Sequence, residues 1–326
     1  MSKLFCRAAA AVVAASILAA SSVAHAQEYP SRTVRIIVAQ PPGGGTDTIA
    51  RLIADRLSKQ LGQTFIVENR PGAGMNVGTE AAARADADGY TLLLGLNGNM
   101  AVNPSLFSNL RYDPIRDFTP VAMLANYPFL LVVNKDLPAN SVKDLIDMAK
   151  AKPGTINYAS AGNGTGQQLA MELFKMLTGT NFTHVPYRGA QAAYIDVFSG
   201  QVPIFFDNIS TAAAQVKGGM VRALAITTRE RSKLLPDLPT LAEAGIPTYE
   251  YHTWFGLWAP NKTPRPIIEK LNAEVRKALS DPAIINNIVA SAGEPATMPL
   301  ADIEPFVKAE ITKWGEVVKK AGSKIE

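Results

Sequence analysis

Short apolar segments typical of buried strands alternate with helical segments along most of this sequence. In the first third, strands are expected at Arg32–Ala39, Phe65–Glu68 and Thr91–Leu94, and helices over residues 46–61 and 76–85 between them. A strand–helix–strand–helix–strand order is typical of a parallel sheet covered by helices on both faces. We therefore expect an α/β fold.

The same pattern continues to the end of the chain. Further strands are expected at Phe129–Val133, Ile156–Ser160, Phe182–Tyr187, Pro203–Asp207, Arg222–Thr227 and Tyr251–Pro260. Ser141 and Asp144 have the spacing of a capping box, which predicts the start of a helix. Two amphipathic helices, with apolar residues from Ile267 to Leu279 and from Phe306 to Val318, are expected to close the chain.

The first 26 residues have the pattern of a cleaved signal peptide. Lys3 and Arg7 precede an apolar run from Ala8 to Ala20, and Ala24-His25-Ala26 is an A-x-A cleavage site. The apolar run is too short for a transmembrane helix. We therefore expect export to the periplasm and a mature chain that begins at Gln27.

The charge and cysteine content of the mature chain exclude some partners. Loss of Lys3 and Arg7 lowers the basic count from 32 to 30 against 28 acidic residues, so the net charge falls from +4 to +2. A nearly neutral chain is not expected to bind nucleic acid. The only cysteine, Cys6, lies in the predicted signal peptide, so an exported protein of this sequence needs no disulfide.

A mature chain of this length is expected to form two lobes, because it exceeds the size of one compact core. We find no flexible linker, but strand-like segments near Val121–Phe129 and Tyr251–Leu257 can cross between the lobes. We assign residues 27–125 with 255–326 to lobe 1 and residues 126–254 to lobe 2. Two short strand crossings suit hinge closure around a ligand.

Two glycine-rich loops each lie between a predicted strand and a predicted helix. The first is Pro41–Thr46, and the second contains Gly162, Gly164 and Gly166. In open α/β sheets, ligands bind beyond the carboxyl ends of the strands, and helix N-termini there offer N–H groups to anions. The alternative is that the glycines only permit tight turns. A matched pair, one per lobe, favours ligand binding.

Nucleotide cofactors are not expected. Neither loop has the lysine of a P-loop, and a dinucleotide fingerprint would need glycine at Gln167 or at Val77. Neither mature histidine, His184 or His252, has a partner at metal-ligand spacing. We therefore expect no cofactor and no metal.

Evidence for catalysis is weak. His184 lies in a predicted strand, where a hydrogen-bonded core role is favoured, and Asp47 could equally cap a helix or contact a ligand. A secreted hydrolase acting on a small organic acid through Asp47 or His184 remains the alternative. No nucleophile, base and orienting group are recognisable together.

Several motifs, in a fixed order, resemble those of the Bug-type periplasmic solute-binding proteins of tripartite tricarboxylate transporters. They include "YPSRTVRIIVAQPPGGGTDTIAR", "VENRPGAG", "YASAGNGTGQQLA", "VPYRG", "FFDN" and "WFGLWAP", and together they cover essentially all of the mature chain. Gln40 and Gln168 depart from the family, which usually has an aromatic residue and commonly a histidine at these positions. Ligand identity therefore cannot be carried over.

The resemblance implies a two-lobed, Venus-flytrap binding protein and no enzyme. It would hold a small di- or tricarboxylate or an aromatic carboxylate, act as a monomer, and deliver the ligand to membrane transporter subunits. The implied ligand contacts are Gln40, Pro42, Gly44, Gly45, Thr46, Asp47, Asn97, Gly98, Asn99, Ser160, Ala161, Gly162, Gly164, Thr165, Gly166, Tyr187, Arg188 and Asp207.

Overall fold

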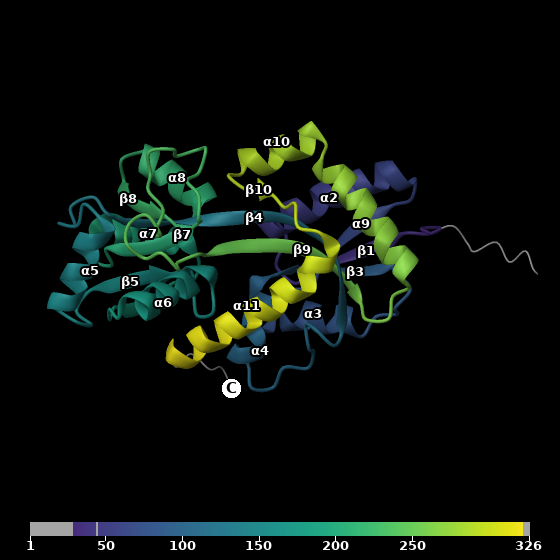
Figure 1. The fold of residues 1–326 in the computed structure, drawn as a ribbon, viewed down its shortest axis with the longest axis horizontal. Coiled ribbons are helices and arrows are strands. Elements are labelled where there is room, and N and C mark those ends of the chain that lie inside the picture. Colours follow the sequence, from purple (N-terminus) through teal and green to yellow (C-terminus); the bar gives the residue numbers. More distant parts are fainter. Residues whose placement is uncertain (1–28, 44, 322–326) are drawn as a thin grey trace, which may run out of the picture.

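The protein consists of two α/β lobes side by side, joined by strands that cross between them (Figure 1). The computed structural model describes residues 29–43 and 45–321, so the predicted signal peptide and Gly44 lie outside the described residues. The sheet of lobe 1 has the strand order β2-β1-β3-β9-β4, and β10 pairs with β4 at its edge. These strands are β1 (Val34–Val38), β2 (Phe65–Asn69), β3 (Thr91–Leu96), β4 (Phe118–Asn134), β9 (His252–Pro260) and β10 (Glu294–Pro295).

The sheet of lobe 2 has the order β4-β7-β5-β6, and β8 pairs with the other edge of β4. Its further strands are β5 (Asn157–Ser160), β6 (Thr183–Pro186), β7 (Ile204–Asn208) and β8 (Val221–Ile226). Within each lobe the strands linked by helices pair in parallel, as the strand–helix repeat predicts. The crossing strands β4 and β9 add antiparallel pairs, so the whole sheet is mixed.

The strand β4 belongs to both sheets. Its first part, up to Pro128, pairs with β9, and its second part, from Phe129, pairs with β7 and β8. The second crossing lies where the Tyr251 N–H donates to the carbonyl of Thr227, directly before β9 begins. Both strand-like crossings expected from the sequence are therefore present.

Helices cover both faces of each sheet. In lobe 1, α2, α9 and α10 share one apolar core, while α3, α4 and α11 pack on the opposite face; in lobe 2, α6 and α5 oppose α7 and α8. The helices are α2 (Gly45–Leu61), α3 (Asn76–Ala83), α4 (Asn103–Leu106), α5 (Val142–Ala151), α6 (Gly166–Thr178), α7 (Ala190–Ser199), α8 (Ile209–Lys217), α9 (Arg265–Leu279), α10 (Pro282–Ala290) and α11 (Leu300–Ala321), with short helical turns η1 (Ala73–Met75) and η2 (Gly98–Val102).

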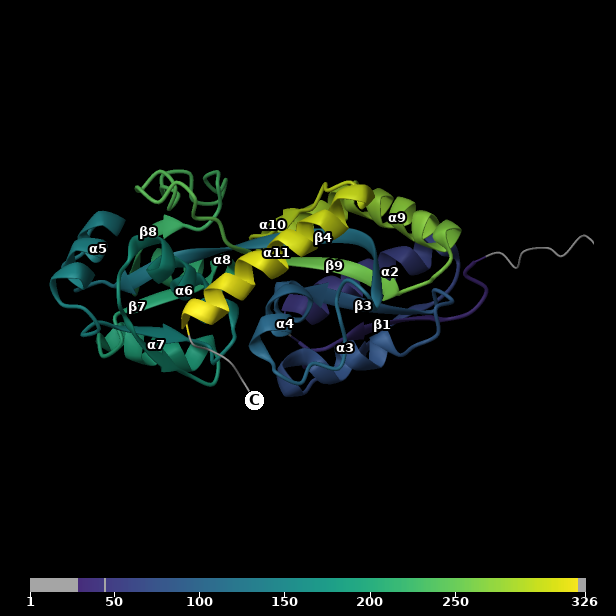
Figure 2. The ribbon, with the colours of Figure 1, turned by 60° about the horizontal axis from the view of Figure 1, so that its bottom comes forward.

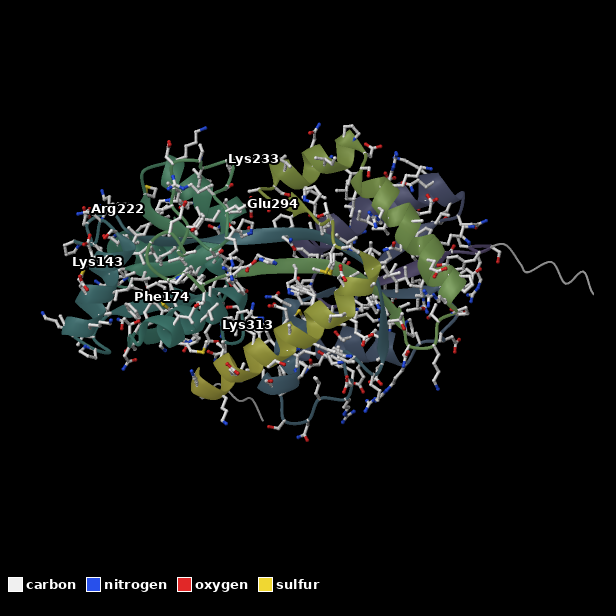
Figure 3. All side chains as sticks on the ribbon, in the orientation of Figure 1. Lys143, Phe174, Arg222, Lys233, Glu294 and Lys313 are labelled. Atoms are coloured by element: carbon white, nitrogen blue, oxygen red, sulfur yellow. The ribbon has the colours of Figure 1, made fainter. Side chains whose placement is uncertain are left out.

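The last helix, α11, spans the junction of the lobes (Figures 1 and 2). It packs against η2 and α4 of lobe 1 and against α6 of lobe 2. The buried carboxylate of Glu310 accepts hydrogen bonds from the indole N–H groups of Trp254 on β9 and Trp314, both at 3.0 Å. It also forms an ion pair with Lys313, which is labelled on α11 in Figure 3.

Local sequence signals account for many of these boundaries. The capping box at the start of α5 is present: Ser141 Oγ accepts from the Asp144 N–H, and the Asp144 carboxylate accepts from the Ser141 N–H. The Asn208 side chain caps α8 in the same manner, by accepting from the Ser210 N–H. Side-chain caps of this kind satisfy donors that a helix leaves unpaired.

Three features of the fold differ from the expectation. The segment Val121–Val133 is one long strand rather than a crossing followed by a separate strand. Three helices close the chain instead of two, because Pro282–Ala290 forms α10 after an Asp281 cap. The helix α8 was not expected, although Asn208 gives it a cap. Among the described residues, no helix is both long and apolar enough to cross a membrane.

Candidate functional site

A cavity of about 870 Å³ lies between the lobes and is lined by residues of both. Its floor is formed by β4 and β9 where these strands cross. The N-termini of α2, α6 and α8 reach the cavity, since Gly45, Gly166 and Ser210 all line it. The carboxyl ends of the strands before these helices therefore meet at one site, as expected for an open α/β sheet.

The first glycine loop leads from β1 into α2. Gly43 adopts a φ of 87°, which only glycine adopts readily, whereas Gly45 begins the helix with φ outside this region and has open space where a Cβ would stand. A β-branched residue at Gly45 would therefore not strain the turn. Thr46 donates a hydrogen bond to the side chain of Gln40, and both line the cavity.

Asp47, in the first turn of α2, stabilises this loop through hydrogen bonds and does not line the cavity. Its buried carboxylate accepts from the Gly43 N–H at 3.0 Å, from Asn69 at 3.0 Å and from Arg51 at 2.9 Å. The hydrogen bond from Arg51 is the main reason why the pKa of Asp47 falls to about 2. At neutral pH the Asp47 side chain is therefore an anion, and its hydrogen bonds hold the loop in place.

The second glycine loop leads from β5 into α6, and Asn163 to Gln167 line the cavity. Thr165 is the N-cap residue of α6, but its side chain does not cap the helix; it donates instead to the Gly162 carbonyl at 2.7 Å. Gln168 is buried behind the loop, where its Oε1 accepts from the Gly164 N–H at 2.7 Å. Gln168 thus supports the loop through this hydrogen bond and does not face the cavity.

His184 is hydrogen-bonded, as favoured from its sequence position, but it is only partly buried. Its Nε2 lies 2.6 Å from Ser160 Oγ, its Nδ1 lies 3.3 Å from the amide nitrogen of Gln168, and its ring stacks on Tyr158. Burial lowers the pKa of His184, which favours the neutral ring. Ser160 is fully buried and does not line the cavity, and the group beyond His184 is an amide rather than a carboxylate, so this pair lacks the arrangement of a catalytic triad.

Asp207 is buried at the end of β7. It accepts from Gln167 at 3.2 Å, from Tyr194 at 3.0 Å and from Thr211. Burial raises the pKa of Asp207, although these donors act in the opposite direction. Because Gln167 lines the cavity and Asp207 does not, Asp207 orients a lining side chain and makes no direct contact with the cavity.

The turn after β3 supplies the remaining predicted polar residues. Asn97 lines the cavity and donates to the Tyr251 hydroxyl at 3.2 Å, which links lobe 1 to the crossing segment. Asn99 is fully buried and supports the turn through the Leu96 N–H and the Thr79 hydroxyl.

The structure thus brings only part of the predicted set together. The predicted residues that line the cavity are Gln40, Gly45, Thr46, Asn97, Gly98, Gly164, Thr165 and Gly166. The predicted residues that do not line it are Pro42, Asp47, Asn99, Ser160, Ala161, Gly162, Tyr187, Arg188 and Asp207. Gly44 lies outside the described residues. Tyr187 is turned to Asp196, to which its hydroxyl donates at 2.5 Å, and Arg188 is exposed.

The sequence analysis did not predict most of the apolar residues that line the cavity. It also did not predict the lining residues at the start of α8. The missed side chains include Met75, Leu106, Phe107, Tyr127, Phe129, Leu169, Asn208, Ser210, Phe255 and Ser291. The rule that ligands lie beyond strand ends could have found Asn208 and Ser210, since they follow β7 directly. The sequence around Tyr127 and Phe129 carries no comparable signal. In the described part of the chain no group of three or more His, Cys, Asp or Glu residues could hold a metal ion.

Comparison with known proteins identifies the family to which this chain belongs. A family model described as the tripartite tricarboxylate transporter family receptor matches residues 49–323. The chain belongs to this receptor family. The receptor is 37% identical to Protein BugT of Bordetella pertussis over 302 residues, which cover 92% of this chain and 93% of BugT. The resemblance to Bug-type proteins is therefore confirmed.

Solved structures share the fold of the receptor. The protein Rpa4515 of R. palustris, solved with adipate, is 39% identical with a TM-score of 0.78, and the match covers 90% of this chain and 99% of that one. MatC from Rhodopseudomonas palustris, with bound malate, is 35% identical with a TM-score of 0.75 and coverages of 89% and 100%. The periplasmic binding protein BugD is 34% identical, with a TM-score of 0.75 and coverages of 91% and 100%. The two-lobed binding-protein fold predicted from the sequence is confirmed.

Proposed function

We propose that this receptor captures a small organic carboxylate in the interlobe cavity outside the cytoplasm and delivers it to the membrane subunits of a tripartite tricarboxylate transporter. The carboxylates in the related structures, adipate and malate, support the ligand class. The A-x-A pattern at Ala24–Ala26 supports export, and the intact mass of the exported protein should correspond to a chain that begins at Gln27.

One observation carries the binding proposal. The helices α2 and α6, one from each lobe, point their N-termini into the same cavity. Each N-terminus has backbone N–H groups without partners inside the helix and a partial positive charge. A carboxylate between two lobes can use such donors without a lysine or arginine.

Calorimetry on protein freed of any carried ligand tests the proposal. Organic acids should bind, and the matching amides at equal ionic strength should not. Removal of the gene for this receptor should abolish uptake of the acid that binds. Binding of neutral sugars or amines, with no response to acids, would refute the carboxylate proposal. Conversion of the acid to a product would instead favour the secreted hydrolase.

A further inference from the structure

We propose that His184 is a positioning residue for the second glycine loop, and that it holds this loop for ligand binding only as a neutral ring with its proton on Nε2. His184 does not line the cavity, so it acts through other residues. Because the loop belongs to the proposed carboxylate site, this role rests on the proposed function. Its consequence is a ligand affinity that falls when the ring takes up a second proton.

The second glycine loop is held from behind by two buried side chains. The Gly162 N–H donates to Ser160 Oγ at 3.1 Å, and the Gly164 N–H donates to Gln168 Oε1 at 2.7 Å. Ser160 and Gln168 are both buried and do not line the cavity, whereas Gly164 does line it. The position of the Gly164 backbone at the cavity therefore depends on groups that a ligand does not touch.

His184 connects these two side chains. Its Nε2 lies 2.6 Å from Ser160 Oγ, and its Nδ1 lies 3.3 Å from Nε2 of Gln168. The ring belongs to β6, whereas Ser160 is the last residue of β5 and Gln168 lies in the first turn of α6. One imidazole therefore links the strand that enters the loop, the helix that leaves it and the neighbouring strand.

The partners in this network assign the tautomer of His184. The Gly164 N–H requires an oxygen, so Gln168 turns its Oε1 to Gly164 and its NH₂ group to the imidazole. Nδ1 must then accept, and the proton of a neutral ring lies on Nε2. Nε2–H donates to Ser160 Oγ, and the Ser160 hydroxyl donates to the Gly162 carbonyl at 3.0 Å. With this tautomer every donor in the network meets an acceptor.

A second proton on the ring disrupts this network. Both nitrogens of an imidazolium carry hydrogen, so Nδ1–H of His184 would face the NH₂ group of Gln168, donor against donor. Rotation of the Gln168 amide would remove this conflict but would place the NH₂ group against the Gly164 N–H. In either orientation a donor loses its acceptor, which costs free energy in a buried site. The loop then loses its support at Gly164.

The charged groups near the ring do not remove this conflict. Glu172 and Lys175 of α6 act on the ring in opposite directions and form an ion pair of 2.9 Å. Tyr158 of β5 stacks on the ring with centroids 4.9 Å apart, and its hydroxyl donates to Glu172. Burial lowers the pKa of His184 below its ordinary value of 6.5, so the ring is neutral at pH 7.

Nuclear magnetic resonance of the ligand-free protein with isotope-labelled histidine tests the tautomer. After loss of residues 1–26 the chain has two histidines, His184 and His252, so the variant His252→Gln assigns both signals. At about pH 8 the His184 ring should carry its proton on Nε2, and the amide shift of Gly164 should follow the titration of this ring. A neutral ring with its proton on Nδ1, or a Gly164 amide that does not respond, would overturn the inference.

Calorimetry with malate and adipate as probes tests the effect on binding. In Gln168→Glu, the carboxylate can accept from both the Gly164 N–H and a protonated Nδ1, so this variant tolerates the imidazolium. The affinity of the wild-type protein divided by that of Gln168→Glu should fall about tenfold between about pH 8 and pH 5. Ionisation of the probe cancels in this ratio. The matched control is His252→Gln, for which the same ratio should stay constant.

The direction of the change is decisive. A bound anion alone would favour the imidazolium, so a ratio that rises or stays constant as the pH falls would overturn the inference. If Gln168→Glu is not folded by circular dichroism, His184→Phe takes its place, because phenylalanine keeps the ring stacking and cannot titrate. Failure of every organic acid to bind the wild-type protein would refute the proposed function, whereas the ring tautomer decides the role of His184 without a ligand.

Discussion

Gly43 and Gly45 have different roles in the first loop, although the sequence presents them as members of one glycine run. Gly43 supplies the turn, because its φ of 87° is unfavourable for other residues. Gly45 supplies open space at the start of α2, directly on the cavity. A side chain added at Gly45 would therefore affect the approach of a ligand. A side chain added at Gly43 would affect the fold of the loop.

The variant Gly45→Val is expected to stay folded and to lose ligand binding. Its backbone conformation suits an L-residue, so the melting temperature should change by only about 1–2 °C. The two methyl groups would project into the cavity, where they would block the approach of a carboxylate to the α2 N-terminus. Calorimetry should show at least about a tenfold loss of affinity, with a smaller loss for Gly45→Ala. Wild-type affinity in a folded Gly45→Val protein would show that the loop is only structural.

Asp47 should contribute stability that depends on pH. Its folded-state pKa of about 2 lies below the ordinary value of 3.8, so the contribution is present at neutral pH and is lost as the pH falls toward 2. Arg51 is half-exposed, and its pairing is therefore partly screened. We expect Asp47→Asn to lower the free energy of unfolding by about 1–2 kcal/mol at pH 7.

Urea unfolding of both proteins between pH 7 and pH 3 measures this difference. The stability gap should narrow below pH 5, because the wild-type carboxylate is then protonated more readily in the unfolded chain. A gap that stays constant over this range would mean that Asp47 acts through packing rather than charge.

Side-chain direction is the part of the site that sequence could not supply. The glycine loops were predicted because they follow strand ends, whereas Gln40, Thr46 and Asn97 were implied by the family resemblance. Asp47 and Asp207 also follow these rules, yet they turn away from the cavity toward Asn69 and Tyr194. Those partners are far along the chain or on another helix, so only the three-dimensional arrangement decides which group faces the ligand.

At the level of whole elements, the long strand β4 and the helix α11 connect the lobes. The sequence analysis expected a strand-like crossing near Val121–Phe129 and a further strand at Phe129–Val133. In the structure the two form one strand that changes its pairing partner, from β9 to β7 and β8. The strand–helix repeat was predictable because hydrophobic periodicity is local, whereas strand pairing and the path of α11 depend on distant contacts.

Glu310 is expected to be a principal stabilising residue of α11. Glu310→Ala would leave the buried indole N–H groups of Trp254 and Trp314 without their acceptor. Each unsatisfied buried donor costs about 1–3 kcal/mol, so the free energy of unfolding should fall by about 2–4 kcal/mol. Chemical denaturation measures the loss. Glu316→Ala, at an exposed position of the same helix, is the matched control and should change stability by less than about 0.5 kcal/mol. Equal effects of the two variants would contradict this role.

For the whole molecule, the main apolar core is continuous across the lobe junction. One cluster contains Leu93 and Met100 of lobe 1, Phe174 and Phe206 of lobe 2, and Trp314 of α11 between them. The lobes are therefore not independent bodies on a flexible tether. The proposed lobe boundaries, residues 27–125 with 255–326 and residues 126–254, describe two halves that share a core.

Ligand binding is expected to narrow the interlobe cavity by bending at the two strand crossings. Small-angle scattering should then give a smaller radius of gyration at saturating ligand than without ligand. The Gly45→Val protein at the same ligand concentration serves as the control and should scatter as the ligand-free protein does. An unchanged scattering curve, with binding confirmed by calorimetry, would count against a closing hinge.

The chain has only three tryptophans: Trp254 and Trp258 on β9 and Trp314 on α11. Trp254 and Trp314 lie near the junction of the lobes, and Trp258 lies further into the lobe 1 sheet. Two of these indoles donate to one carboxylate, and the rings of Trp254 and Trp258 lie 5.7 Å apart. The tryptophan fluorescence of the protein therefore comes from β9, which leads out of the crossing between the lobes, and from α11, which spans their junction. Emission from indoles responds to nearby charge and to ring separation. The rate of the fluorescence change after rapid mixing with ligand can therefore give the rate of movement at the lobe junction in unlabelled protein. Tryptophan fluorescence can therefore report lobe closure without an added fluorescent label.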